Sequence, residues 1–296
     1  MPGTGSTAAR MGLTITPQAL AAELGTPGLV VLDGSVFQRP SPDLTTMLQE
    51  SARASFEKHR IPGSVHLDAL DWLWDRSKPY RFALPSPEAA AAAFAAHGIG
   101  EGSRVVVYDR VGGNWAARTF WTLHWLGFDD VRVLEGGFAA WKAAGLPVDS
   151  GPAAPPTPAA RPFTPRPRAT TIADRTEVLA AIAAPGVTVI NALSPEQHAG
   201  TGGLRYHRAG RIAGSGNLPA ARLADATLAP EAITALAAEA GIAPGQRVIA
   251  YCGGGIAACN LAFNLLRAGW TDLAVYDASL DEWGRDPSLP METGPG

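Results

Sequence analysis

One stretch in the second half of the chain decides the fold: Arg247-Val248-Ile249-Ala250-Tyr251-Cys252-Gly253-Gly254-Gly255. Its apolar residues predict a buried strand, the three glycines predict a tight turn, and the segment that begins at Ile256 has the composition of a helix. Cys252 therefore lies where a strand ends and a helix begins. Three successive glycines let several backbone N–H groups point inward, and the helix N-terminus adds a positive dipole end. Such a place favours a sulfur anion.

A single cysteine in a protein is often only a small core residue. Glycines at a strand-to-helix junction favour a functional loop instead. We therefore predict that Cys252 is the catalytic residue and that the backbone N–H groups of the loop surround it. The loop consists of Gly253, Gly254, Gly255, Ile256 and Ala257.

The composition indicates a soluble protein of about two domains, with 296 residues of which 46% are hydrophobic. A net charge of −3 gives no electrostatic reason to expect nucleic acid or an anionic membrane as a partner. Residues 1–12 are rich in Gly, Ser, Thr and Ala, which predicts a mobile tail. The two cysteines, Cys252 and Cys259, are about two helical turns apart and predict no disulfide, so we expect a reducing, cytoplasmic setting.

The chain contains two similar halves. A helix predicted from Pro87 and the strand that ends at Asp109 reappear 143 residues later, at Pro230 and Cys252. Residues 149–170 are rich in proline and predict an extended linker. We therefore expect domains at 13–148 and 171–296, each an α/β domain with a mostly parallel sheet and helices on both faces.

The duplication also predicts which half is active. Ligands bind at the carboxyl ends of strands in such folds, where Cys252 lies. Its counterpart in the first half is Asp109, and the loop after Asp109 is bulkier. A carboxylate cannot supply the same nucleophile, so we expect the first half to be inactive and to form one wall of the pocket.

Several motifs in order resemble the two-domain rhodanese-type sulfurtransferases, which include thiosulfate and 3-mercaptopyruvate sulfurtransferases. The resemblance extends from about Leu13 to Thr293 and implies two tandem rhodanese-like domains. In the first half it rests on residues 56–68, 107–109 and 134–141. In the second half it rests on residues 210–219, the Cys252 loop and residues 276–283.

The resemblance implies that sulfur moves through a persulfide on Cys252, from thiosulfate or 3-mercaptopyruvate to cyanide or a thiol. It implies neither a metal nor a cofactor, because inward N–H groups stabilise the terminal sulfur of the persulfide. A thiol-bearing protein is a further possible acceptor. A persulfide carrier that serves one protein partner uses the same cysteine and stays open as an alternative. A cysteine-dependent phosphatase is disfavoured, because Ala258 stands where such enzymes need an arginine.

The chain departs from the family pattern at residues that concern the donor. Gly254 lacks the hydroxyl usual in mercaptopyruvate-type loops, and Leu193 replaces an arginine expected to bind the donor's anion. Basic residues of a glycine-rich loop are the predicted replacements, because a guanidinium holds a carboxylate or sulfonate with two hydrogen bonds. These candidates are Arg205, Arg208, Arg211 and His198. Trp72 and Trp74 of the first half are further candidates, for a wall of the pocket.

Overall fold

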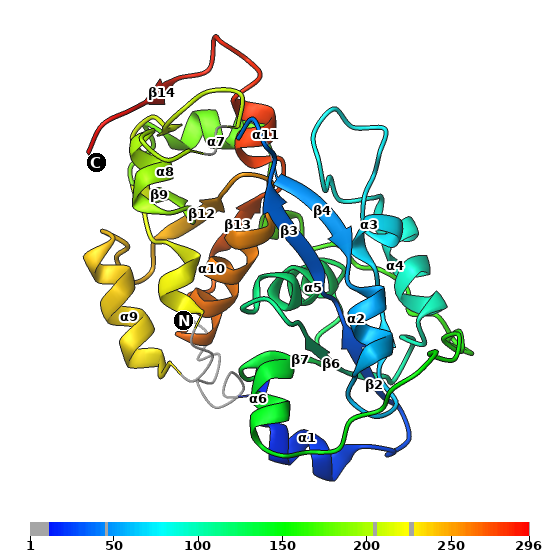
Figure 1. Cartoon of the computed structure of the whole chain (residues 1–296). Helices are drawn as coiled ribbons and strands as arrows, with labels where there is room; N and C mark the ends of the chain where they lie inside the picture. Colours follow the sequence, from blue (N-terminus) through cyan, green and yellow to red (C-terminus); the bar gives the residue numbers. More distant parts are fainter. Residues whose placement is uncertain (1–11, 45–46, 204–205, 225–227, 296) are drawn as a thin grey trace.

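Two five-stranded parallel sheets, one in each half of the chain, form the framework of the computed structural model (Figure 1). The structure describes residues 12–44, 47–203, 206–224 and 228–295. The first sheet has the order β1 (Thr14–Ile15), β7 (Val131–Leu134), β6 (Arg104–Tyr108), β2 (Leu29–Asp33), β5 (Val65–His66). The second has the order β8 (Ile172–Ala173), β13 (Leu273–Tyr276), β12 (Arg247–Tyr251), β9 (Val187–Asn191), β11 (Gly216–Asn217). Equivalent strands hold equivalent places, and every neighbouring pair is parallel. The α/β class with parallel sheets is confirmed.

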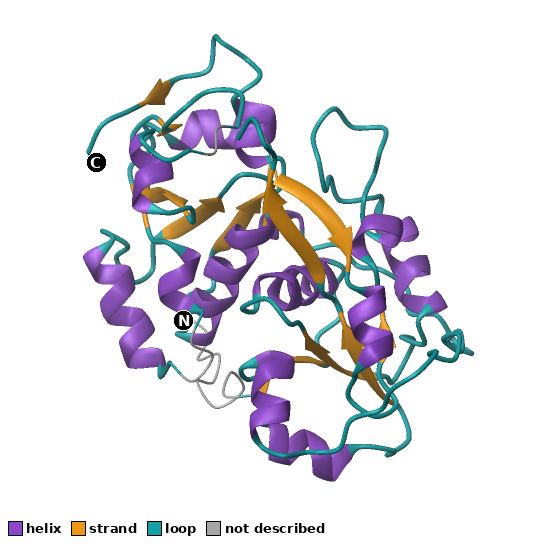
Figure 2. Ribbon diagram, viewed as in Figure 1, coloured by secondary structure: helices purple, strands orange, loops and turns teal. Residues whose placement is uncertain are grey.

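Helices connect and flank the strands (Figure 2). The first half contains α1 (Pro17–Glu23), α2 (Arg53–Lys58), α3 (Ala69–Trp72), α4 (Pro87–Ala96), α5 (Asn114–Trp125) and α6 (Gly137–Ala143). The second contains the 3₁₀ turns η2 (Ala169–Thr171) and η3 (Ala220–Leu223), and α7 (Arg175–Ala181), α8 (Pro195–Ala199), α9 (Pro230–Glu239), α10 (Ile256–Arg267) and α11 (Ser279–Trp283). Helix α4 begins as its sequence predicts: Pro87 takes the first position, and the Ser86 hydroxyl accepts the N–H of Ala89 at 3.2 Å.

The two halves share one apolar core between their sheets. In β12, Val248 and Ala250 face this shared core, while Ile249 and Tyr251 face a separate cluster on the other side of the second sheet. The strands of the first half alternate in the same way. Helices α5 and α10 pack against each other between the sheets. The ring of Phe120 meets that of Phe263 there, with centroids 4.7 Å apart. The halves are therefore joined by core packing rather than by the linker alone.

Two antiparallel pairs lie outside the parallel sheets. Strands β3 (Val36–Pro40) and β4 (Met47–Ser51) pair in the first half, and β10 (Arg211–Ile212) pairs with β14 (Met291–Glu292) in the second. The pair β3–β4 reaches from the first sheet toward α11 of the other half (Figure 1). The duplicated pattern of the sequence does not predict it, because the second half has no counterpart among the described residues.

The proline-rich segment lies along the first half. The N–H of Ala159 donates to Ala95 O, and that of Arg166 donates to Leu126 O, both at 2.8 Å. The predicted limits of the tail, the domains and the linker stay predictions, and residues 1–11 of the tail lie outside the described residues. In the part of the chain that the structure describes, no helix combines the length and apolar character needed to cross a membrane.

Candidate active site

Cys252 follows the last residue of β12 and is buried, with 3% of its surface exposed. It lines a cavity of about 210 Å³. Both halves build this cavity: the loop after β12 and the segment around Leu193 form one side, and β3, β4 and the segment at Arg81 form the other. The lining residues are Gln38, Met47, Gln49, Arg81, Phe82, Leu193, Gln197, Tyr206, Cys252, Gly253, Gly254, Ile256 and Ala257. The first half thus forms a wall of the pocket, as its sequence leads one to expect.

The glycine loop turns through a left-handed residue immediately before α10. Gly255 has φ = +79° and is the N-cap of that helix. A Cβ at this position would lie 2.6 Å from the carbonyl oxygen of Asp277, so only glycine fits. Because Gly255 has no side chain, it leaves the first N–H groups of α10 without a cap from the N-cap residue. Unpaired N–H groups at a helix N-terminus are suited to hold a negative charge.

Ser279 anchors the glycine loop through hydrogen bonds to its backbone. Its hydroxyl accepts the N–H groups of Cys252 and Gly255, each at 3.1 Å, and donates to Tyr276 O at 2.8 Å. Ser279 adopts φ = +52°, which is uncommon for a residue with a side chain. The sequence predicted N–H groups that point inward at Gly255. The structure instead directs the Gly255 N–H toward Ser279, which fixes the backbone at both ends of the glycines.

The first half has the same loop, closed by its own side chain. The Asp109 carboxylate follows β6 and accepts four backbone N–H groups. They come from Val111, Gly113, Trp115 and Ala116, at 2.8–3.0 Å. Gly113 is the left-handed N-cap of α5, as Gly255 is of α10. Burial raises the pKa of the Asp109 carboxyl, and the N–H groups of Ala116, Gly113 and Val111 oppose that rise. The loop of this fold therefore directs several N–H groups at one enclosed acceptor, and in the first half that acceptor is the Asp109 carboxyl group.

Arg81 brings a positive charge to the cavity. Its Nε donates to Asp281 Oδ2 at 3.2 Å and its Nη1 donates to Met47 O at 2.8 Å. Asp281 also accepts the backbone N–H of Arg81 at 2.8 Å and is paired with His207 at 2.9 Å. Burial opposes ionisation of Asp281, but these hydrogen bonds outweigh it and lower the pKa of its carboxyl. The ionised Asp281 therefore fixes Arg81 beside Cys252.

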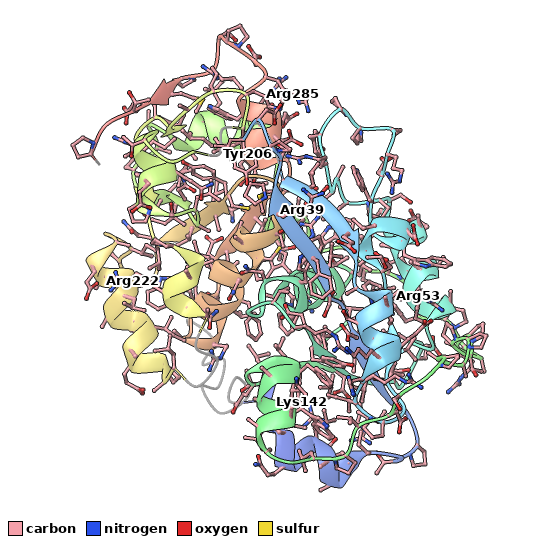
Figure 3. All side chains as sticks on the ribbon, in the orientation of Figure 1. Arg39, Arg53, Lys142, Tyr206, Arg222 and Arg285 are labelled. Atoms are coloured by element: carbon pink, nitrogen blue, oxygen red, sulfur yellow. The ribbon has the colours of Figure 1, made fainter. Side chains whose placement is uncertain are left out.

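Tyr206 lies against the residue after Cys252. A Cβ built on Gly253 would lie 1.9 Å from Tyr206 Cζ and 2.2 Å from its hydroxyl oxygen, so the phenol occupies the space that a side chain at 253 would need. Figure 3 labels Tyr206 near the end of β3–β4 that approaches the second half. Burial and the negative charge of Cys252 raise the pKa of the phenol, so it keeps its proton.

The second cysteine belongs to the core between the halves. Cys259 lies on α10, and burial raises the pKa of its thiol to about 12. Arg118 of α5 contacts its sulfur at 3.7 Å and pairs with Asp277 at 2.6 Å. Both Cys252 and Cys259 are free thiols. Cys259 is thus a protonated core residue, which agrees with the expectation of no disulfide.

Three of the basic candidates of the sequence are bound elsewhere. The Arg208 guanidinium donates to four carbonyl oxygens, those of residues 283, 284, 286 and 289. Arg211 is buried, donates to Gly294 O and pairs with Glu292. His198 is buried, and burial with the positive charge of Arg211 lowers its pKa to about 4. None of these three lines the cavity of Cys252 among the described residues, and Arg205 lies outside the described residues.

The two tryptophans of the first half do not line the cavity either. Trp72 is 46% exposed and meets the ring of His97. Trp74 packs against Phe82, which lines the cavity, with ring centroids 5.0 Å apart. Trp74 therefore supports the wall from one layer behind. Leu193, where the family pattern expects an arginine, does line the cavity, so an apolar side chain occupies that place.

Sequence reasoning missed Arg81 and Tyr206. Arg81 is far from the cysteine in the chain, and only the docking of the two halves brings them together. Tyr206 belongs to the same glycine-rich loop as the predicted donor-binding residues Arg205 and Arg208. No local signal separates Gly253 from Gly254 in the sequence: neither has a positive φ, yet only Gly253 has a side chain packed against it.

Comparison with known proteins agrees with this architecture. The family model described as the rhodanese-like domain matches residues 16–144 and 174–286. A probable 3-mercaptopyruvate sulfurtransferase of Pseudomonas aeruginosa is 34% identical, over 95% of this chain and 98% of its own. A thiosulfate sulfurtransferase of Cricetulus griseus is 30% identical, over 87% of this chain and 85% of its own.

Solved structures share the fold at lower identity. SseA from Escherichia coli, a 3-mercaptopyruvate sulfurtransferase, has a TM-score of 0.78 and 24% identity, over 90% of this chain and 98% of its own. An anaerobic ergothioneine biosynthesis enzyme from Chlorobium limicola has a TM-score of 0.80 and 24% identity, over 96% of this chain and 71% of its own. With a family model that covers both halves and relatives at or above 30% identity over nearly the whole length, the chain belongs to the rhodanese family and is a two-domain sulfurtransferase.

Proposed function

We propose that the chain transfers a sulfane sulfur from a small anionic donor to a thiophilic acceptor through a persulfide on Cys252. One observation carries this proposal. Cys252 is the only free thiol among the described residues that line the cavity, and it lies between a strand end and an uncapped helix N-terminus. The equivalent loop of the first half supports it, because four N–H groups there donate to the carboxyl oxygens of one enclosed side chain, Asp109.

The chemistry needs a thiolate, room for one more sulfur and a place for its charge. The Cys252 thiolate attacks the outer sulfur of the donor, and the donor leaves with the electrons of the broken bond. An acceptor such as cyanide or a thiol then takes the terminal sulfur and restores the thiolate. The residues that follow Cys252 in the cavity wall are Gly253, Gly254, Ile256 and Ala257, whose small or apolar side chains leave room for the extra sulfur. Neither a metal nor a cofactor takes part in these steps.

We propose that Arg81 binds the negatively charged group of the donor. Among the described residues that line the cavity, it is the only one with a positive charge. Its Nε and Nη1 are held by Asp281 and Met47, while no described residue accepts from its Nη2. Leu193 supplies no charge at the place where the family pattern has an arginine. The positive charge that binds the donor then comes from Arg81 in the first half, and not from Arg208 or Arg211 in the second half.

The donors that fit are thiosulfate and 3-mercaptopyruvate, the two named for the similar enzymes. Each carries one sulfur to transfer and an anionic group for Arg81. Cyanide and thiols, including a thiol on a protein, are the acceptors that this chemistry allows. Both cysteines are free, which suits a reducing cytoplasmic setting.

Replacing Cys252 with Ser tests the mechanism. An oxygen cannot form the persulfide, so we expect no transfer with either donor while the fold, measured by circular dichroism, is retained. The wild type treated with donor alone should gain the mass of one sulfur atom, and cyanide should remove it. Cys259→Ser is the matched control and should still gain the mass of one sulfur atom when it is treated with donor. Transfer by the Cys252 variant would overturn the proposal, and a sulfur gain that small acceptors cannot discharge would favour a persulfide carrier.

A further inference from the structure

The hydroxyl of Tyr206 has no partner among the described residues although it lies at the reaction site. The residue is 9% exposed and lines the cavity with Cys252. No described residue accepts from or donates to its hydroxyl oxygen. A phenol hydroxyl at a cavity normally hydrogen-bonds to water or to a ligand there. A hydroxyl left open toward a cavity is therefore placed for a ligand.

Gly253 and Tyr206 fit each other, which fixes where the hydroxyl lies. Because the phenol occupies the place of a Cβ at 253, its oxygen is in contact with the residue that follows the nucleophile. Burial of the ring holds this position. Gly254, one residue further, has no hydroxyl, and a Cβ there would meet only Arg81 O at 3.9 Å and Phe82 Cδ2 at 4.0 Å. The glycines thus offer no proton, and the Ser279 hydroxyl already donates to Tyr276 O, whereas the Tyr206 hydroxyl lies against Gly253.

The two donor classes differ in their need for a proton. Thiosulfate releases sulfite, a stable anion at neutral pH. A thiol on the carbon next to a keto group releases the enolate of pyruvate, whose carbon must gain a proton to become the product. A phenol is a much stronger acid than that carbon, and positioned proton donors speed such steps by about 10²–10⁴-fold.

We propose that Tyr206 is the proton donor to the carbon leaving group of a β-mercapto α-keto acid, which makes that class the preferred donor. This inference rests on the proposed Cys252 persulfide. The Cys252 thiolate forms the S–S bond, the C–S bond breaks, and its electron pair goes to the carbon as an enolate. The Tyr206 hydroxyl protonates the carbon. The resulting phenolate takes the proton of the persulfide S–H, so pyruvate, Cys252–S–S⁻ and the neutral phenol result.

The state of the phenol suits this role. Burial and the charges of Cys252 and Asp281 raise its pKa, while Arg81 opposes them. The phenol therefore stays protonated beside the thiolate until a stronger base, the enolate, forms next to it. Arg81 is also close enough to stabilise the short-lived phenolate.

The test compares two donors in four proteins: wild type, Tyr206→Phe, Gly254→Ser and the double variant. Tyr206→Phe keeps the ring against Gly253 and removes only the hydroxyl. We expect kcat with 3-mercaptopyruvate to fall about 100-fold with little change in KM, and the fall with thiosulfate to be at least about tenfold smaller. In the double variant, the serine introduced by Gly254→Ser has room to supply a hydroxyl, so the 3-mercaptopyruvate rate should recover at least about tenfold over Tyr206→Phe.

Equal losses with both donors, or no loss, would overturn the role of Tyr206, because a packing role does not distinguish leaving groups. Failure of the double variant to recover any rate would also contradict it. These outcomes can be distinguished from failure of the proposed persulfide mechanism. The Cys252→Ser variant tests that mechanism with either donor. Thermal unfolding of each variant checks that the comparison is made between folded proteins.

Discussion

Asp109 and Cys252 occupy the same place in the two domains, after strands β6 and β12, but only Asp109 binds its own loop. The carboxylate receives four N–H groups at 2.8–3.0 Å and is 2% exposed. The thiol, by contrast, lines a cavity of about 210 Å³. The same loop is thus filled in one domain and accessible to a small molecule in the other.

The first prediction concerns Asp109→Ala. It leaves four buried N–H groups without an acceptor, so we expect the free energy of unfolding to fall by about 3 kcal/mol or more. The sulfur-transfer rate per folded molecule should change little, because Asp109 does not line the cavity of Cys252. Urea unfolding and steady-state kinetics measure the two quantities. Asp71→Ala, at an exposed carboxylate, is the control and should leave stability within about 0.5 kcal/mol. Equal stability of the two variants would show that the Asp109 hydrogen bonds do not hold the first loop.

A second prediction concerns the donor's anion. Arg81→Met removes a charge-assisted contact that such donors would make, so we expect KM for both donors to rise about tenfold with a smaller effect on kcat. The KM of Arg81→Lys should lie between those of the wild type and Arg81→Met, because lysine keeps the charge but not the planar donor group. Arg285→Met is the matched control: Arg285 also pairs with Asp281, at 3.2 Å, but does not line the cavity. A similar rise in KM for Arg81→Met and Arg285→Met would contradict this prediction. It would show that the rise comes from loss of an ion pair with Asp281 and not from loss of a contact with the donor.

The duplicated pattern predicts the strands that matter most. Apolar runs before Asp109 and Cys252 identify β6 and β12, because a buried parallel strand needs such residues on both faces. The pattern also locates Cys252 and the glycine loop, since strand end, turn and helix start are neighbours in the chain. These features depend on local sequence and on its repetition.

The rest of the site depends on contacts between distant residues. Arg208 and Arg81 are the same residue type, and no local pattern separates the one bound by carbonyl oxygens from the one at the cavity. The difference arises when the two halves dock through α5 and α10 and Asp281 receives Arg81. The cavity wall from β3 and β4 has the same origin, because polar residues such as Gln38 and Gln49 resemble an ordinary surface hairpin.

The last prediction uses the two adjacent glycines as a pair. A Cβ at 253 would lie 1.9 Å from Tyr206 Cζ, whereas a Cβ at 254 would find no atom closer than 3.9 Å. Gly253→Ala must therefore displace the phenol or the loop, and we expect it to lower the free energy of unfolding by about 1–3 kcal/mol. Gly254→Ala should cost less than about 1 kcal/mol, because the methyl group fits.

A double-mutant cycle decides whether Tyr206 is the cause. In a Tyr206→Ala background the ring is gone, so Gly253→Ala should lose most of its penalty, and the coupling energy should reach at least about 1 kcal/mol. Gly254→Ala in the same background should show none. Urea unfolding of the six proteins gives both coupling energies. If Gly253→Ala keeps its full penalty without the ring, the glycine is required by the backbone and not by Tyr206. The hydroxyl would then lack the fixed position that proton transfer to a donor requires.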